Sequence, residues 1–139
     1  MSVDRQAFED QVIKDMREHG GVISSGPMAG SRLLVLTTTG AKSGQSRRVL
    51  LFFSKDGADY VIAGTASGST HDPAWLRNLE ANPTPSVEVD GRQFNASATV
   101  AEGAERDRLW QQHLEAAPQL AAHAEQAGRP IPMVRLTPK

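Results

Sequence analysis

One short segment of the chain combines glycine, hydroxyl and cationic residues at a spacing that suits an anion. The segment TTTGAKSGQSRR, from Thr37 to Arg48, contains a turn bounded by Gly40 and Gly44 between two apolar stretches. Such a turn exposes backbone N–H groups, and Lys42 and Arg47 stand beside it. Free amides, a hydroxyl and a bidentate guanidinium are the groups that hold phosphate or carboxylate. The same residues also fit a solvated hairpin tip, so the turn alone leaves both interpretations open.

Charge is distributed unevenly around this turn. The chain has a net charge of -1, yet no Asp or Glu stands between His19 and Lys55. That segment carries +5, so the rest of the chain carries -6; its cations are Arg32, Lys42, Arg47, Arg48 and Lys55. A near-neutral total and only 5% aromatic residues speak against nucleic-acid binding. The segment predicts a partner that is a small anion.

Several other chemical motifs are missing from the sequence. Gly44 is followed by Gln45, so the turn is not a Walker loop, and no GxGxxG segment occurs. There is no cysteine, and the four histidines form no metal-binding motif. We therefore predict no metal site and no classical catalytic residue. Redox chemistry in this chain would need a bound organic cofactor.

The elements that must position the turn follow from hydrophobic periodicity. An amphipathic helix is expected over residues 3–19, with Phe8, Val12, Ile13 and Met16 on one face. Further helices are expected over 74–81, 102–116 and from Pro118 to the break at 128–130. Six strands are expected, over 33–39, 47–54, 60–63, 86–89, 93–100 and 131–136.

Short strands separated by tight turns favour a barrel, and 139 residues fit one domain. We expect residues 1–139 to form a single domain of the α+β class, mainly β, with about six antiparallel strands and flanking helices. No apolar run reaches the roughly 18 residues of a membrane helix, and the first 15 residues do not resemble a signal peptide. A cytoplasmic protein is the expectation.

Four segments in order carry a resemblance to a known family. They are LLVLTTTGAKSGQSRRVLL, an Asp-Gly turn, DYVIAGTASG and DPAWLRNLEANP, covering roughly Leu33 to Gly91, with a weaker echo at GRPIPMV. Together they resemble the deazaflavin-dependent nitroreductase family. The resemblance implies a split β-barrel of the FMN-binding type. It also implies coenzyme F420, a deazaflavin with a phosphate and an oligoglutamate tail, as cofactor.

The resemblance further implies which residues bind the cofactor. The tail would lie at Lys42, Ser43, Gln45 and Arg47, and the ring above Leu50 and Phe52. The remaining cofactor-binding positions would be Ala63, Thr65, Ala66, Ala74, Trp75 and Asn78. Trp75 and Leu50 fit a barrel core equally well. Three positions depart from the family pattern, namely Ala41, Ser46 and Ala66, each of which replaces a residue common in the family.

The expected function is transfer of a hydride from the reduced deazaflavin to a small electron-poor acceptor, such as a quinone, an enone or a nitro compound. The nitroreductase branch has late tyrosines where this chain has Ala117, Leu120 and His123, so nitroimidazole reduction is not expected. The acceptor would lie near Trp110, Leu114, Leu120 and Met133. His123 would be either its proton donor or an exposed helix residue.

Two alternatives stay open at this stage. The chain could bind a deazaflavin as a carrier without turnover, or the barrel could bind FMN, whose short tail ends in one phosphate. The sequence leaves open whether the protein is a monomer or a homodimer. No nucleic acid and no transmembrane segment is expected.

Overall fold

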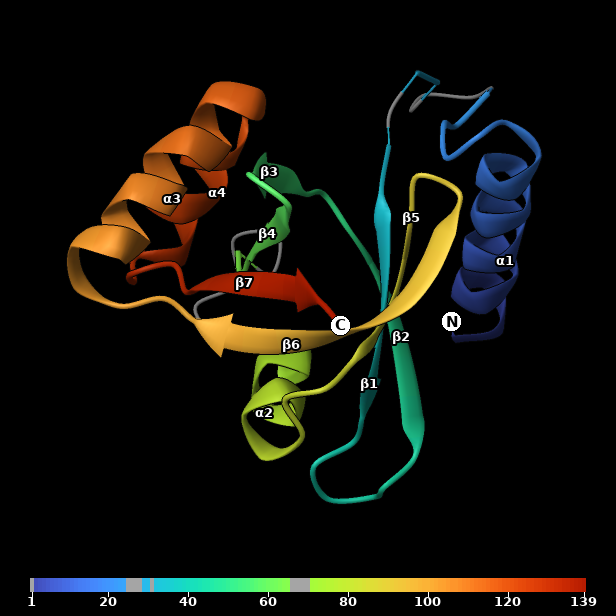
Figure 1. Ribbon diagram of the computed structural model, residues 1–139, viewed down its shortest axis with the longest axis horizontal. Helices are drawn as coiled ribbons and strands as arrows, with labels where there is room; N and C mark the ends of the chain where they lie inside the picture. Colours follow the sequence, from blue (N-terminus) through green and yellow to red (C-terminus); the bar gives the residue numbers. More distant parts are fainter. Residues whose placement is uncertain (1, 25–28, 31, 66–70) are drawn as a thin grey trace.

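The computed structural model describes residues 2–24, 29–30, 32–65 and 71–139. Within these ranges a curled antiparallel sheet of seven strands is flanked by four helices (Figure 1). The helices are α1 (Ser2–Glu18), α2 (Ala74–Ala81), α3 (Gly103–Ala116) and α4 (Leu120–Ala127). The strands are β1 (Leu34–Thr39), β2 (Ser46–Leu51), β3 (Ser54–Asp56), β4 (Asp59–Ala63), β5 (Ser86–Val89), β6 (Arg92–Val100) and β7 (Met133–Pro138).

The sheet has the strand order β2-β1-β5-β6-β7-β4-β3, and every pair is antiparallel. The nine-residue β6 is shared by both halves. Its first part, Arg92–Asn95, pairs with β5, and its second part, Ala96–Val100, pairs with β7. One long bent strand therefore joins the two halves, which confirms the expected split β-barrel.

The expected strand over 47–54 is two strands in the structure, which is why seven strands replace the expected six. Leu51 is the last residue of β2 paired with β1, and Ser54 is the first residue of β3 paired with β4. Phe52 and Phe53 cross from one edge of the sheet to the other. The apolar run continues through the crossing, so its hydrophobicity conceals the change of partner.

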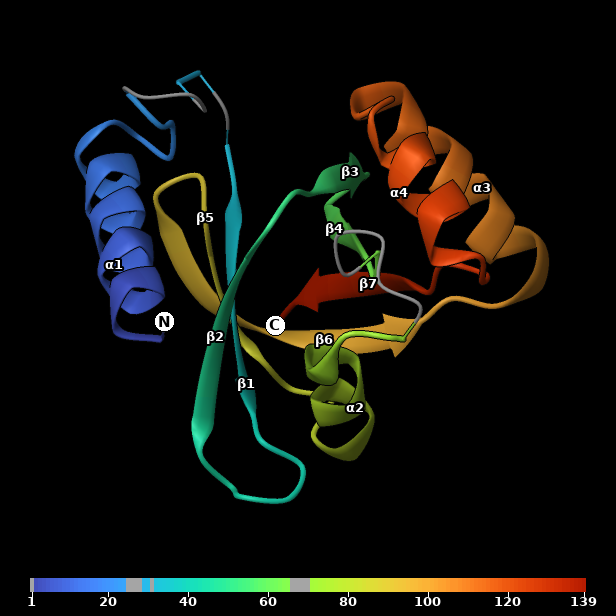
Figure 2. The same ribbon diagram turned by 180° about the vertical axis from the view of Figure 1, so that it is seen from behind.

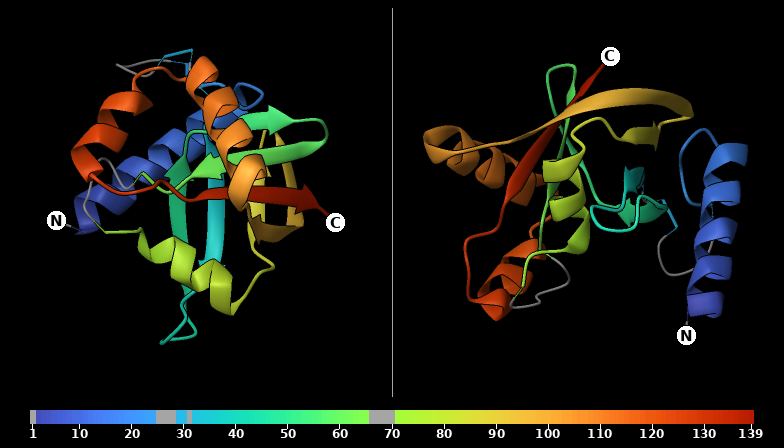
Figure 3. Two further views of the ribbon diagram at one scale, coloured as in Figure 1. Left: turned by 90° about the vertical axis from the view of Figure 1, so that its left-hand side faces the viewer. Right: turned by 90° about the horizontal axis from the view of Figure 1, so that it is seen from below.

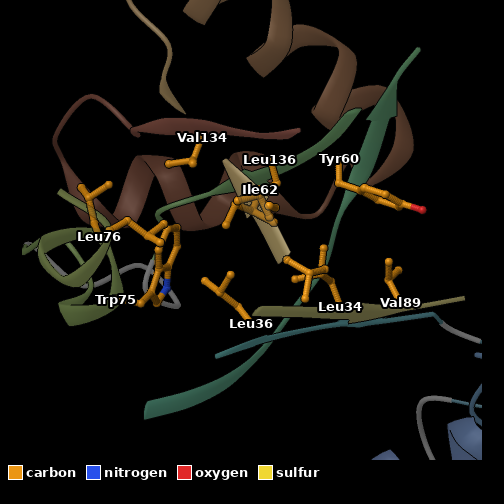
Figure 4. Packing of buried hydrophobic residues seen from close by; sticks show 12 residues of the cluster. Leu34, Leu36, Tyr60, Ile62, Trp75, Leu76, Val89, Val134 and Leu136 are labelled. Atoms are coloured by element: carbon orange, nitrogen blue, oxygen red, sulfur yellow. The ribbon is translucent and has the colours of Figure 1, made fainter. Parts of the chain in front are cut away.

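The core between the two halves is closed by α2. Trp75, Leu76 and Leu79 of this helix are buried with Leu34, Leu36 and Ile62 of the sheet. Figure 4 shows the Trp75 ring beside Leu36, with Leu76 at the end of the same cluster next to α2. The i, i+1 and i+4 spacing of these helical residues forms one apolar face. This packing fixes α2 next to the turn between β1 and β2 (Figure 2).

Helix α1 lies along the outer side of β1, β2 and β5 (Figure 3). Val12, Ile13 and Met16 pack against Val35 of β1, as their spacing predicts. Phe8 departs from that expectation, because its side chain is 54% exposed. Ion pairs add to the contact. Arg17 binds both carboxylate oxygens of Glu88 at 2.7 and 2.8 Å, and Arg48 approaches Asp10 to 2.8 Å.

Helices α3 and α4 flank the half of the sheet that contains β4 and β7. Leu109 of α3 and Ala127 of α4 are buried with Val61 and Met133 of these strands. Among the described residues, no helix is long and apolar enough to cross a membrane.

Candidate cofactor cleft

An open cleft of about 970 Å³ lies between β2, the turn that precedes it, and helices α2 and α4. Its volume is at the upper end of the range for small-molecule and cofactor sites. Ten of the twelve predicted cofactor residues line it. They are Lys42, Ser43, Arg47, Leu50, Phe52, Ala63, Thr65, Ala74, Trp75 and Asn78. The structure thus brings together residues separated by up to 36 positions in the sequence.

The turn at one end of the cleft is held by its own hydrogen bonds. Gly40 N–H donates to the Gln45 carbonyl at 2.8 Å, and Gly44 N–H donates to the Gly40 carbonyl at 2.9 Å. The Ser43 hydroxyl accepts the Gln45 N–H at 3.2 Å. Gly44 has a φ of +71°, a conformation that glycine adopts without strain. Gln45 therefore supports the turn through its backbone, and its side chain does not line the cleft.

Asn78 connects this turn to α2 and to β1. Its Oδ1 accepts the backbone N–H of Ala41 at 3.0 Å, and its Nδ2 donates to Thr38 Oγ1 at 3.1 Å. The side chain is buried, so both ends of the amide find partners inside the protein. Asn78 thus orients the turn in addition to lining the cleft.

Within the described part of the chain, four Lys and Arg side chains line the cleft, and no Asp or Glu does. Lys42 and Arg47 come from the turn and its following strand, and both are exposed. Arg48 is paired with Asp10 at 2.8 Å, so α1 neutralises part of its charge. Arg77 of α2 is the fourth and was not predicted. Its signal was present, because Ala74, Arg77 and Asn78 have the i, i+3, i+4 spacing of one helix face.

The other side of the cleft is apolar. Phe52, Ala63, Trp75 and Leu120 contribute to it, and Thr65 is the neighbouring polar residue. Trp75 is only 8% exposed, so it packs in the core and also lines the cleft. Ala66, the last predicted ring contact, lies outside the described residues.

Leu50 also has two environments. Along β2, Val49 and Leu51 pack toward the barrel core, whereas Leu50 packs partly against the α1 cluster that contains Val35. The strand alternation places these residues on opposite faces. Leu50 nevertheless lines the cleft, because β2 is an edge strand and the cleft runs along it.

A buried hydrogen bond lies behind Phe52. His113 Nδ1 and Ser54 Oγ are 2.6 Å apart, and the Phe52 ring meets the imidazole edge-on with centroids 5.2 Å apart. His113 is 1% exposed, and its burial lowers the pKa to about 4. The ring is therefore neutral at physiological pH and serves the packing of the β2–β3 crossing.

Arg129 fixes the wall of the cleft that contains Thr65. Its Nη2 donates to the carbonyls of Gly64 and His71, both at 3.0 Å, and to the Thr65 carbonyl at 3.3 Å. Its Nη1 binds Asp72 at 2.9 Å. One guanidinium thus joins two backbone segments that border the cleft. Nothing in the sequence indicated this role, because Arg129 stands between a glycine and a proline in a segment expected only to end a helix.

The predicted acceptor-lining residues are divided by the structure. Leu120 lines the cleft together with His123. Met133 and Trp110 instead pack in the cluster between β7 and α3, so their expected role beside the acceptor is wrong. Helical spacing identified an apolar face on α3, but that face covers the sheet. Among the described residues, no group of acidic or histidine side chains is arranged to hold a metal ion.

The open cleft of this split barrel is basic at one end and apolar at the other. These features are typical of split-barrel oxidoreductases that use a flat cofactor with an anionic tail. Comparison with known proteins makes this class specific. Residues 10–138 match the family model for F420H(2)-dependent quinone reductases, and the chain belongs to that family.

Named relatives agree with this assignment. An F420H(2)-dependent quinone reductase of Mycobacterium tuberculosis is 36% identical over 107 residues, which are 75% of this chain and 72% of the relative. The solved structure of an F420-H2 dependent reductase is 33% identical, with a TM-score of 0.68, over 75% of this chain and 92% of that one. A solved domain-swapped dimer is 28% identical, with a TM-score of 0.71, over 96% and 98% of the two chains.

Proposed function

We propose that this cleft binds coenzyme F420, with the tail at the β1–β2 turn and the ring at the apolar end, and that the protein reduces quinone-type acceptors with it. The single observation that carries the proposal is the division of one cleft into a cationic end and an apolar end. A coenzyme with a charged tail and a flat ring has the same division. Membership of the quinone reductase family supports the choice of coenzyme and acceptor.

The charge of the lining residues supports the placement of the coenzyme tail at the β1–β2 turn. Lys42, Arg47 and Arg77 all line the cleft, and among the described residues no carboxylate lines it to oppose an anion. A guanidinium can bind phosphate or carboxylate through two parallel hydrogen bonds. A tail with one phosphate and several glutamates can occupy several such cations, whereas the short tail of FMN offers one phosphate. The number of cations therefore favours F420 over FMN.

Two features support the placement of the ring at the apolar end of the cleft: the spacing along the chain and the position of β2 at the edge of the sheet. Phe52 follows Arg47 by five residues, which is about 16 Å of extended chain. A ring near Phe52 and a tail near Arg47 are therefore separate subsites of one molecule. Because β2 is an edge strand of the described sheet, its outer edge has backbone N–H and C=O groups that no other strand pairs with. Such groups suit the polar edge of a deazaflavin ring.

The chemistry that the bound coenzyme supplies is hydride transfer from its ring. The residues of the chain bind the coenzyme and orient it toward the acceptor. Trp75 and Phe52 exclude water from the ring end, and Lys42 and Arg47 fix the tail. Holding two reactants at near-attack distance lowers the barrier, so this chemistry does not require a protein nucleophile.

Steady-state oxidation of reduced F420 by menadione tests this function, with the recovery of the oxidised coenzyme's absorbance as the signal. Saturable turnover with menadione is the expected result. Tight binding of F420 without turnover on any quinone would identify a carrier instead. Oxidation of reduced FMN but not of reduced F420 would replace the coenzyme assignment.

The assembly and the location of the protein stay predictions. A homodimer draws support from the structural neighbour that is a domain-swapped dimer, and a monomer is the alternative. Light scattering on the purified chain distinguishes the two. The cytoplasmic location expected from the sequence is tested by fractionation of cells that express the protein.

A further inference from the structure

His123 is the polar side chain of the apolar end whose hydrogen bonding is incomplete. It lines the cleft from α4, and among the described residues its Nδ1 is buried without a hydrogen-bond partner. A buried polar atom without a partner costs free energy, so such an atom in a folded protein calls for an explanation. His113, whose whole side chain is buried, has its Nδ1 satisfied by Ser54.

The missing partner has a chemical consequence. The hydrogen bond made by one ring nitrogen of a histidine decides which nitrogen carries the proton. His113 is held in this way, but no partner among the described residues fixes the His123 ring. Its proton can therefore reside on either nitrogen, and the half-exposed ring can present N–H or a lone pair to the cleft.

The position of His123 separates it from the tail subsite. Leu120 and His123 are three residues apart, so one face of α4 presents both to the cleft. The β1–β2 turn and α4 lie on either side of α2 (Figures 1 and 3). An acceptor next to α4 would thus lie at the ring end, far from the cations that hold the tail.

We propose that the His123 imidazole hydrogen-bonds a carbonyl oxygen of the quinone and protonates it during reduction. This inference rests on the proposed function. The quinone gains two electrons and one hydrogen as the hydride, while the oxygen bonded to His123 takes the proton. The imidazole N–H bond that faces the oxygen breaks as the O–H bond forms, and the ring takes up a proton from water. The products are a hydroquinone and the oxidised coenzyme, and the ring ends in the state in which it began.

The test measures binding without turnover. The protein is saturated with oxidised F420, which holds no hydride, and menadione is titrated by calorimetry. His123→Leu is expected to weaken menadione binding about 10-fold, as for the loss of one hydrogen bond, while the F420 affinity is unchanged. His19→Leu is the matched control, because His19 is bonded to Asp15 beside α1, away from the cleft. It should leave both affinities unchanged.

A second variant separates binding from proton transfer. His123→Asn keeps a hydrogen-bond donor but cannot act as an acid, so menadione affinity should be largely retained while the rate of hydroquinone formation falls. In the wild type, the His123 ring ¹⁵N resonances should shift when menadione is added. Equal menadione affinity in wild type and His123→Leu would overturn the role of His123 alone. Failure of the wild type to bind F420 would overturn the proposed function with it.

Discussion

The side-chain carbonyl of Asn78 accepts the backbone N–H of Ala41 at 3.0 Å, and so ties α2 to the turn that precedes β2. The other end of the amide donates to Thr38 Oγ1 at 3.1 Å. One buried side chain thus connects a helix, a strand and a turn. The orientation of the basic turn depends on the packing of Trp75 and Leu76, because these residues hold α2 on the core.

Replacement of Asn78 by alanine is expected to loosen the turn. Two buried hydrogen bonds are lost, and Thr38 Oγ1 and the Ala41 N–H lose a partner, so the free energy of unfolding should fall by about 1–3 kcal/mol. F420 affinity should fall with it, because the cations of the turn are no longer held in place. Urea denaturation and F420 titration measure both effects. The control Asn82→Ala, at an exposed position after the same helix, should change neither.

Replacement of Gly40 by alanine is expected to disturb the turn from inside. A Cβ at this position would lie 2.6 Å from Ser43 Oγ and 3.3 Å from the Gln45 carbonyl oxygen. Ser43 would have to release the Gln45 N–H, so F420 affinity should decrease. The double variant Gly40→Ala/Ser43→Ala removes the closer contact. It should therefore unfold at a higher urea concentration than Gly40→Ala does, a measurement that does not depend on the place of Ser43 in the tail subsite, and unfolding at a lower urea concentration would contradict this explanation.

The double variant Lys42→Ala/Arg47→Ala is expected to weaken F420 binding by 10-fold or more, about 1.4 kcal/mol per decade. The difference in F420 affinity between wild type and double variant should be smaller at high salt, because exposed charges are screened. The same titration on Arg32→Ala provides a control, since Arg32 is a cation of the same segment that pairs with Asp90 and does not line the cleft. Unchanged affinity in the double variant would remove the turn from the site.

Stability should depend on pH through His113. Burial lowers its folded pKa to about 4, below the unfolded value of 6.5. Above pH 6.5 the ring is neutral in both states. As the pH falls from about 6.5 to 4, only the unfolded chain takes up the proton, so stability decreases by at most about 3 kcal/mol. Denaturation of wild type and His113→Asn across this range tests the effect, because the variant should lose this pH dependence.

A further decrease in stability is expected at lower pH from a different group. Arg108 and Arg135 hold the pKa of the Asp56 carboxyl well below its usual range. Protonation of Asp56 therefore weakens the fold as the pH falls below the ordinary carboxyl pKa of 3.8, at the lower end of the His113 window and beyond it. A pH profile of His113→Asn that retained the full slope between pH 6.5 and 4 would contradict the role given to His113.

Local chemistry explains which parts of the fold could be predicted. The glycines around Lys42, the proline before Ala74 and the Asp90-Gly91 pair determine turns and helix starts over a few residues. Asp90 and Gly91 indeed have positive φ angles of 52° and 76°, as a tight hairpin turn requires. Such signals place the basic turn and α2 within one or two residues.

Tertiary pairing explains what could not be predicted. The break at Phe52 and Phe53 depends on which strand lies opposite, and their hydrophobicity is the same in either case. Trp110 and Met133 are apolar like cleft residues, but Met133 is buried, and Trp110 partly buried, where α3 packs against the sheet. Arg129 binds backbone carbonyls that are more than 50 residues away in the sequence. No local pattern identifies such partners.

The most direct test of the central claim is a fluorescence titration of the purified protein with oxidised F420 and with FMN, each at low and high salt. We predict micromolar or tighter binding of F420, weaker binding of FMN, and a loss of F420 affinity as salt increases. Equal or tighter binding of FMN, or no binding of F420, would contradict the assignment of this cleft to a deazaflavin with an anionic tail.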